Sequence, residues 1–382
     1  MITAYVKPTN FCNVGCTHCY LPEEVRANKF LMTEDRVREV ARFVKDMAMV
    51  QRHDSAHILW HGGEPLTVPI DWYYKANDIL KEELGYNYIQ SMQTSLIPLR
   101  KEHIKMFKDF MEYQVGTSID FSQRMLKGKV ENYHKLWMTK VDMAREEDIL
   151  VLPGVVPTRN ELGREKDIVQ FFMDRNFKMF NIDRYNQYNT FFPDRPSNLE
   201  HSKFLIGLFD ALMENLELKG WSPFVNAISG AMTGILYDQG GDRWGTTCMT
   251  DFVVIEPNGN LNNCTDKATV EPSYSQLEDG YKEFARSHFR KKWVKIQTID
   301  HKENHCRKCE NASWCRSGCP ITPNGIINGE DECSGYKTFI NHVREFIKKN
   351  GEEPILKYLE QREKDPWVDL GSPYSAAKYE VA

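Results

Sequence analysis

The sequence predicts an α/β fold, a partial (β/α)6 TIM-like barrel followed by a smaller C-terminal module. Short apolar segments alternate with amphipathic helical segments through roughly the first 220 residues, the pattern of parallel β/α units. The ten cysteines lie in two groups, three near the N-terminus and seven between residues 248 and 333, and the long stretch between the groups has none. A chain of 382 residues has room for one large domain and a smaller one.

Six strands and the helices between them are expected from the hydrophobic periodicity. The expected strands are residues 2–6, 57–60, 88–93, 115–119, 149–156 and 179–183. The expected helices are the segment capped by Thr33 and residues 72–84, 101–111, 133–145, 166–174 and 199–218. Because parallel strands end at one edge of the barrel, the polar loops that follow them form the expected site.

The cysteine distribution also divides the chain. We expect a barrel at 1–222, a cysteine-rich domain at 223–345 and a polar C-terminal tail or helix at 346–382. Within the second unit, the turn Pro257-Asn258-Gly259-Asn260 is typical of a hairpin and brings flanking residues together.

Composition narrows the functional classes. The net charge of −5 gives no sign of nucleic-acid binding, and no apolar run approaches the length of a membrane span. The N-terminus carries no export signal, so a cytoplasmic location is expected. Disulfides are rare in that reducing compartment, so metal binding is the expected role of the cysteines.

The N-terminal loop holds Cys12, Cys16 and Cys19 within eight residues. Three thiolates on one short loop can hold three irons of a cubane cluster and leave the fourth iron open to an external ligand. The alternative is a zinc site completed by His18, although this residue lies between two ligands and would strain the loop.

The seven C-terminal cysteines contain the run C-x2-C-x5-C-x3-C. They are Cys248, Cys264, Cys306, Cys309, Cys315, Cys319 and Cys333. CxxC pairs are typical of zinc ribbons, but two zinc sites need eight ligands and would require a histidine.

The CxxxCxxC loop after the first strand, with Gly62-Gly63-Glu64-Pro65 after the second, resembles the radical S-adenosylmethionine (SAM) superfamily. The resemblance implies a [4Fe–4S] cluster on the N-terminal cysteines and SAM bound to its open iron. It also implies contacts to SAM from residues that follow the successive strands: Tyr20, Gly62, Gly63, Glu64, Gln93, Ser118, Asp120, Arg124 and Asn160.

The C-terminal spacing resembles the SPASM domain, an auxiliary iron–sulfur cluster domain of some radical SAM enzymes. The resemblance implies that Cys248, Cys264 and Cys319 hold one auxiliary [4Fe–4S] cluster. It places a second on Cys306, Cys309, Cys315 and Cys333. With the N-terminal cluster this makes three [4Fe–4S] clusters and uses all ten cysteines.

Relatives with a SPASM domain mostly modify peptides or proteins, so a precursor peptide is the expected substrate. We expect a side-chain crosslink of the cyclophane or thioether type, formed after a 5′-deoxyadenosyl radical abstracts hydrogen. The alternative is an anaerobic sulfatase-maturing, formylglycine-generating enzyme. Such relatives carry Asp directly after the second auxiliary cysteine, where this chain has Thr265, and a further cysteine where it has Asp242.

A different class, an electron-transfer iron–sulfur protein without substrate chemistry, is also kept, although the barrel and the Gly-Gly-Glu-Pro segment argue against it. Weak candidates for catalytic residues are Asp266, Arg184 and Tyr185. The expected partners are the precursor peptide and an electron donor of the flavodoxin or ferredoxin type. Because the chain begins with the first strand, a separate peptide-recognition protein is a further expected partner.

Overall fold

The computed structural model describes residues 1–85, 87–185, 193–241, 243–266, 272–295, 298, 306–319, 321–322 and 332–363. Its strands are β1 (Ile2–Thr9), β2 (Gly15–Cys16), β3 (Ala56–Gly62), β4 (Tyr88–Thr94), β5 (Gln114–Ser118), β6 (Arg124–Met125), β7 (Leu150–Val155), β8 (Met179–Ile182), β9 (Phe224–Val225), β10 (Phe252–Ile255), β11 (Asn260–Asn262) and β12 (Ser275–Gln276). All six expected strands are present, as β1, β3, β4, β5, β7 and β8.

Helices connect these strands. They are α1 (Glu23–Ala27), α2 (Glu34–Gln51), α3 (Ile70–Leu84), α4 (Lys101–Phe110), α5 (Val130–Arg145), α6 (Glu165–Asp174), α7 (Asn198–Lys219), α8 (Asn226–Tyr237), α9 (Thr247–Thr250), α10 (Gly280–Arg286), α11 (His288–Lys295), α13 (Ala312–Cys315), α14 (Lys337–Asn350) and α15 (Glu353–Glu363). Three 3₁₀ turns are η1 (Pro65–Thr67), η2 (Arg159–Glu161) and η3 (Leu277–Asp279). As expected, Thr33 caps α2, because its hydroxyl accepts a 3.3 Å hydrogen bond from the Arg36 N–H.

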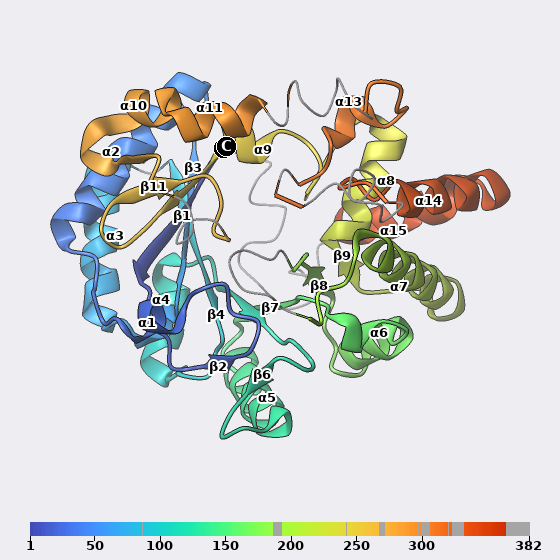
Figure 1. The fold of residues 1–382 in the computed structure, drawn as a ribbon. Coiled ribbons are helices and arrows are strands. Elements are labelled where there is room, and N and C mark those ends of the chain that lie inside the picture. The colour runs from blue at the N-terminus through green and yellow to red at the C-terminus, as the bar shows by residue number, and fades with distance from the viewer. Residues whose placement is uncertain are drawn as a thin grey trace.

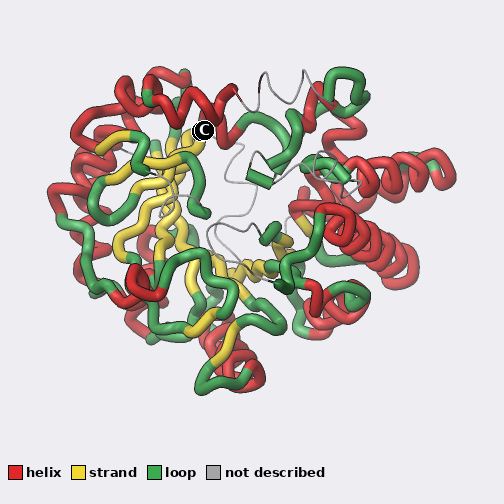
Figure 2. The backbone as a smooth tube through the Cα atoms, viewed as in Figure 1, coloured by secondary structure: helices red, strands yellow, loops and turns green. Residues whose placement is uncertain are grey.

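One sheet runs through the whole molecule, in the order β12-β11-β10-β1-β3-β4-β5-β7-β8-β9. From β10 to β9 every neighbouring pair is parallel, so the carboxyl ends of these strands meet at one edge. The strands form an open arc with α2, α3 and α4 on its outer side (Figures 1 and 2). This arrangement is the partial barrel that the sequence predicts.

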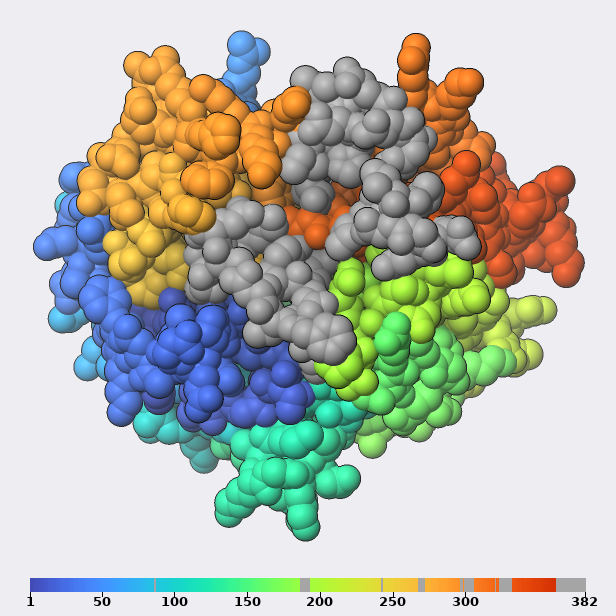
Figure 3. All heavy atoms as spheres, viewed as in Figure 1, coloured from blue at the N-terminus to red at the C-terminus, as the bar shows by residue number. Residues whose placement is uncertain are grey.

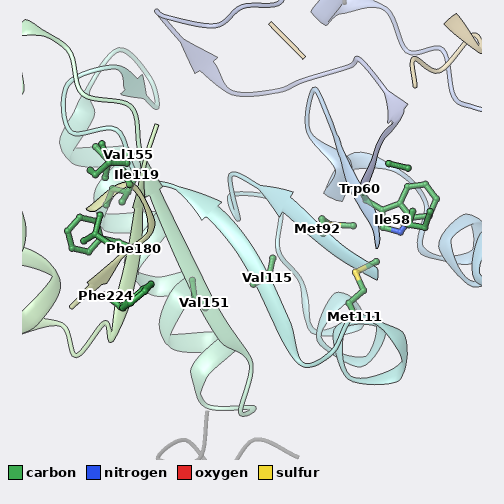
Figure 4. Packing of buried hydrophobic residues seen from close by; sticks show 14 of the residues in the cluster. Ile58, Trp60, Met92, Met111, Val115, Ile119, Val151, Val155, Phe180 and Phe224 are labelled. Carbon is green, nitrogen blue, oxygen red and sulfur yellow. The ribbon is translucent and has the colours of Figure 1, made fainter. Parts of the chain in front are cut away.

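The apolar core lies between the sheet and these helices. Figure 4 shows buried side chains that follow the arc from Trp60 on β3 through Val115 on β5 to Phe180 on β8 and Phe224 on β9. Trp60 packs edge-on against Trp72 of α3, with ring centroids 5.5 Å apart. These packed strands give the loops at their carboxyl ends a rigid base.

The sheet crosses the expected boundary between residues 222 and 223. β10, from the C-terminal part, pairs in parallel with β1, and β9 extends the other end of the sheet beside β8. The turn at 257–260 joins β10 to the antiparallel β11, with Gly259 at φ +90°, as expected for a hairpin. The cysteine-rich part therefore shares a continuous sheet with the barrel.

The expected C-terminal tail contains a helix that belongs to the core. In α15, Tyr358 is fully buried, and its hydroxyl accepts a 2.8 Å hydrogen bond from the Val225 N–H. The helix α14 crosses the expected boundary at 345–346. Among the described helices, none combines the length and apolarity needed to cross a membrane.

Candidate functional site

The cysteine loop after β1 is fastened to the barrel on two sides. The short strand β2 pairs with β6, which places Cys16 opposite Arg124. At the loop's start, the Cys12 N–H donates to the Arg26 carbonyl at 3.0 Å. The loop position is therefore set by backbone pairing with segments that are distant in sequence.

The Gly62-Gly63 turn packs directly against this loop. The Gly63 N–H donates to the Thr9 carbonyl at 3.1 Å, and the Glu64 N–H donates to the Phe11 carbonyl at 2.8 Å. A Cβ on Gly62 would lie 2.2 Å from the Thr9 carbonyl oxygen, and Gly62 has φ +124°. Only glycine fits such an approach, so this turn requires the sequence found there.

Glu64 lies beneath that turn and is 1% exposed. Its carboxylate accepts hydrogen bonds from the N–H groups of Leu66, at 3.0 Å, and Ser95, at 2.9 Å, and from the hydroxyls of Thr94 and Ser95. Four donors fill both oxygens, so this carboxylate joins the turn to the end of β4. A direct contact between Glu64 and SAM stays a prediction, whereas its bonding within the protein is observed.

Asp120 forms the centre of a second buried network. Its Oδ2 contacts Arg124 Nε at 2.6 Å and His18 Nε2 at 3.2 Å, and its Oδ1 accepts from the Val156 N–H at 2.7 Å. Burial opposes ionisation, but the Arg124 and His18 charges outweigh it and lower the pKa of Asp120. Sequence reasoning considered His18 only as a metal ligand and missed this link between the cysteine loop and the end of β5.

The other expected SAM contacts differ in their burial and in their hydrogen bonds. Gln93 Nε2 donates to the Ser118 hydroxyl at 3.0 Å, so the ends of β4 and β5 are brought together. Asn160 lies exposed in η2, where its N–H donates to Thr158 Oγ1 at 3.2 Å. The Tyr20 hydroxyl is buried next to the cysteine loop.

The two candidates that follow β8 differ in their surroundings. Arg184 is buried and donates to the Tyr336 hydroxyl at 3.1 Å and the Pro196 carbonyl at 2.6 Å, which ties β8 to the C-terminal part. Tyr185 is also buried, and its ring centroid lies 6.0 Å from that of His18. Tyr185 therefore reaches the cysteine loop, while the Arg184 guanidinium bonds within the protein.

The cysteines gather into three groups. We name them the N-terminal thiol set (Cys12, Cys16 and Cys19), the three-thiol set (Cys248, Cys264 and Cys319) and the four-thiol set (Cys306, Cys309, Cys315 and Cys333). In each set, burial is the main cause that raises the pKa of one thiol, Cys12, Cys264 or Cys315, and the charges of other thiols in the same set add to it. All ten are free thiols. The grouping matches the one that the family resemblance implies.

The N-terminal thiol set has properties that fit a bound cluster and ligand. Burial, followed by the nearby charges, raises the pKa of Cys12 to about 12, so its thiolate needs a positive partner such as iron. Three buried polar atoms on this loop have no hydrogen-bond partner among the described residues: Asn10 Oδ1, His18 Nδ1 and the Tyr20 hydroxyl. Buried polar atoms without partners fit a polar ligand such as SAM.

The four-thiol set is built from tight turns. The Cys309 N–H donates to the Cys306 carbonyl at 3.1 Å, and the Gly318 N–H donates to the Cys315 carbonyl at 2.9 Å. Gly335 lies against the thiols, because a Cβ there would be 2.6 Å from Cys315 Sγ and 3.8 Å from Cys333 Sγ. Four thiols held around one space by backbone turns fit a cubane cluster.

The three-thiol set faces the N-terminal loop through Asp266. Burial is the main cause that raises the pKa values of Cys264 and Tyr20, and the Asp266 charge adds to both. This carboxylate therefore lies in electrostatic range of both the cysteine loop and the three-thiol set. Asp242, which stands at the position where sulfatase-maturing relatives carry a further cysteine, lies outside the described residues.

Across the described residues, no group of three His, Cys, Asp or Glu side chains is arranged as ligands of one metal ion. A cubane places each thiolate on a different iron, so its ligands surround a larger space. The N-terminal thiol set would hold the cluster that binds SAM. The other two sets would hold auxiliary clusters, and all three assignments remain proposals.

A buried ion pair beneath the site was missed by sequence reasoning. Lys7 Nζ lies 2.6 Å from Glu256 Oε1, and Asn10 Nδ2 donates to Glu256 Oε2 at 2.8 Å. The ammonium also lies 5.1 Å from the centre of the Tyr20 ring. A single lysine in the apolar strand ITAYVKPT was the available signal, but its partner follows β10, almost 250 residues later.

Comparison with known proteins agrees with this geometry. The radical SAM superfamily pattern matches residues 6–169. A serine-type anaerobic sulfatase-maturating enzyme from Bacteroides thetaiotaomicron is 30% identical, and the match covers 90% of both chains. An uncharacterized protein of Synechocystis sp. is 26% identical over 48% of this chain. The chain matches only part of such relatives, 48% of the length of the Synechocystis protein and 25% of the length of an uncharacterized protein from Archaeoglobus fulgidus.

Solved structures share the fold at lower identity. The structure described as native anSMEcpe with bound AdoMet has a TM-score of 0.72 at 18% identity and covers 93% of this chain and 98% of its own. The structure of Streptococcus suis SuiB bound to precursor peptide SuiA has a TM-score of 0.59 at 14% identity. The match covers 84% of this chain and 72% of the SuiB chain. The chain belongs to the radical SAM superfamily, among the SPASM-type enzymes that include the anaerobic sulfatase-maturating enzymes.

Proposed function

We propose that this enzyme modifies a ribosomally made peptide by joining two of its side chains, after radical cleavage of SAM. The division of the ten thiols into sets of three, three and four carries the proposal. It supports one cluster for SAM cleavage and two auxiliary clusters, and leaves no cysteine for nucleophilic catalysis. Of the solved relatives, SuiB was captured with its precursor peptide SuiA, and a peptide substrate for this chain is our inference.

When bound, the N-terminal cluster and SAM would supply a primary carbon radical that takes a hydrogen atom from the substrate. Joining two side chains removes two hydrogens in total, one as that hydrogen atom and one as a proton with an electron. The electron requires an acceptor, and an auxiliary iron–sulfur cluster is of the right chemical class. An electron carrier of the flavodoxin or ferredoxin type would reduce the enzyme beforehand.

We assign Asp266 as the acceptor of this proton. Its charge acts on Tyr20 of the cysteine loop and on Cys264 of the three-thiol set, which supports a place for Asp266 within electrostatic range of both. A carboxylate there can accept a proton from a substrate radical as the new bond forms. The packed networks of Glu64 and Asp120 hold the segments that follow β4 and β5 in place.

Formation of formylglycine from a serine is the second candidate. The specific observation in its favour is the 90% coverage of a serine-type sulfatase-maturating enzyme at 30% identity. Asp266 also weakens the objection raised by Thr265, because its charge reaches the three-thiol set from one position further along the chain. Both reactions need the same proton acceptor.

One experiment tests the shared chemistry. Anaerobically reconstituted enzyme should bind about 12 irons and release 5′-deoxyadenosine from SAM with dithionite. Replacing Cys12, Cys16 and Cys19 by alanine should remove about four irons and abolish the release. Release that persists in this variant would defeat the N-terminal assignment, and no release from the wild-type enzyme would favour an electron-transfer protein.

A second experiment separates the two reactions. The enzyme is given peptides encoded beside its gene and a serine peptide with a sulfatase motif. A crosslink and a serine-derived aldehyde both lower the mass by about 2 Da, since each product loses two hydrogens. Only the aldehyde then condenses with a hydrazine reagent, which adds the mass of the reagent less one released water. A hydrazine-reactive product from the sulfatase peptide alone would replace our first candidate by the second.

A further inference from the structure

A buried arginine connects the two segments that carry the first two cysteines of the three-thiol set. Arg290 belongs to α11 and is 4% exposed. Its Nη1 donates to the Cys248 carbonyl at 3.4 Å and to Asn263 Oδ1, and its Nη2 donates to the Met249 carbonyl. The helix lies at the edge of the molecule, in orange in Figure 3.

Asn263 completes the connection. Its Nδ2 donates to the same Cys248 carbonyl that accepts from Arg290. Cys248 lies in α9, whereas Cys264 follows Asn263 directly beyond β11. Arg290 and Asn263 therefore fix the spacing of two thiols that come from different elements.

The charge of Arg290 has no carboxylate partner in an ion pair anywhere in the described part of the chain. Its guanidinium contacts carbonyl oxygens and lies 5.0 Å from the Phe284 ring centre. The nearby Asp251 carboxylate instead contacts His53 Nε2 at 2.9 Å. A guanidinium stays charged in proteins, and burying a charge without a counter-charge is costly. Something negative is therefore expected beside Arg290.

A [4Fe–4S] cluster on three thiolates has a net negative charge, which increases by one when the cluster is reduced. We infer that Arg290 is a positioning residue for the cluster of the three-thiol set, and that its charge favours the reduced state of that cluster. This inference rests on the proposed function, because it requires a cluster at these thiols.

The consequence is a measurable effect on redox potential. A positive charge beside the cluster stabilises the more negative, reduced form and so raises the midpoint potential. Loss of the charge should shift the midpoint to lower values. Loss of the guanidinium contacts should also reduce cluster occupancy, since Cys248 and Cys264 would no longer be held together.

The experiment uses the full chain with Cys12, Cys16 and Cys19 replaced by alanine, so that the signals come from the auxiliary clusters. Arg290→Met removes the charge and keeps an apolar stem, and Arg290→Lys keeps a charge. Arg286→Met is the matched control, because this nearby arginine is exposed and its ion pair with Glu283 spans 3.9 Å. Iron content and midpoint potentials are measured by redox titration monitored by electron paramagnetic resonance.

We expect Arg290→Met to lower one of the two midpoint potentials or to lose up to about four irons. Arg290→Lys should keep most of the parent's midpoint potential and iron content, and Arg286→Met should match the parent in both. Full iron content with unchanged potentials in Arg290→Met would overturn the inference, as would equal losses in the Met and Lys variants. If the parent protein holds no cluster that depends on Cys248, Cys264 and Cys319, the proposed function fails first, and this inference with it.

Discussion

The ion pair between Lys7 and Glu256 offers a stringent test of how the barrel is joined to the cysteine-rich part. Both side chains are buried, and the pair lies one step beyond the β1–β10 register, in which Val6 pairs with Ile255. Removing one partner of a buried pair leaves an uncompensated charge, at a cost of about 3–5 kcal/mol. Glu256→Gln also weakens the acceptor for Asn10, so we expect that variant at the upper end of the range.

Replacing both partners by apolar residues should be far less costly. Buried pairs exchanged for apolar side chains of similar size are often neutral or more stable by about 1–4 kcal/mol. Lys7→Met with Glu256→Leu should therefore unfold much closer to wild type than either Lys7→Met or Glu256→Leu alone. The coupling free energy in this double-mutant cycle should be several kcal/mol.

The assay is urea-induced unfolding under anaerobic conditions, followed by tryptophan fluorescence. The control is Arg36 with Glu278, which also joins the two parts at 2.6 Å but whose side chains are 27% and 52% exposed. Glu278→Gln should cost no more than about 1 kcal/mol. The reasoning would be refuted if the single variants at Lys7 and Glu256 each lowered the free energy of unfolding by less than Glu278→Gln does, and if their effects were additive.

Three further predictions concern the site. Glu64→Gln should destabilise the fold by about 1–3 kcal/mol, because its amide nitrogen cannot accept from the backbone donors that Glu64 binds; an unchanged unfolding midpoint would contradict this. The lowered pKa of Asp120 means that its ionised form stabilises the fold above the unfolded-state value of about 3.9, and this contribution is lost as the pH falls toward the folded-state value. Asp120→Asn should therefore reduce stability at pH 7 and less so in acid, whereas a pH-independent difference would refute the assignment. Gly335→Ala should displace Cys315 and lose about four irons, while Gly241→Ala, whose Cβ would have only ordinary contacts, should retain them.

Much of the fold could be predicted because its signals are local. The hydrophobic periodicity of a strand or helix appears within a few consecutive residues, so all six barrel strands and the turn at Gly259 were predicted from the sequence. Cysteine spacing is local as well, and the resemblance that it carries divided the thiols into the same three sets that the structure brings together. Local patterns missed α8 and did not show that α15, within the expected tail or helix, packs into the core, because that burial depends on neighbours elsewhere in the chain.

By itself, the sequence determined the barrel and the superfamily, and it predicted the ligand sets of the thiols. Only the tertiary structure decided which charges meet: Lys7 with Glu256, His18 with Asp120, and Arg290 with the Cys248 carbonyl. Charges of this kind act over a few ångströms in space; β10 pairing with β1 brings Lys7 to Glu256, and β2 pairing with β6 brings His18 to Asp120. The physical reason is that a residue type fixes what a side chain can bind, whereas sheet pairing between distant segments fixes what it does bind.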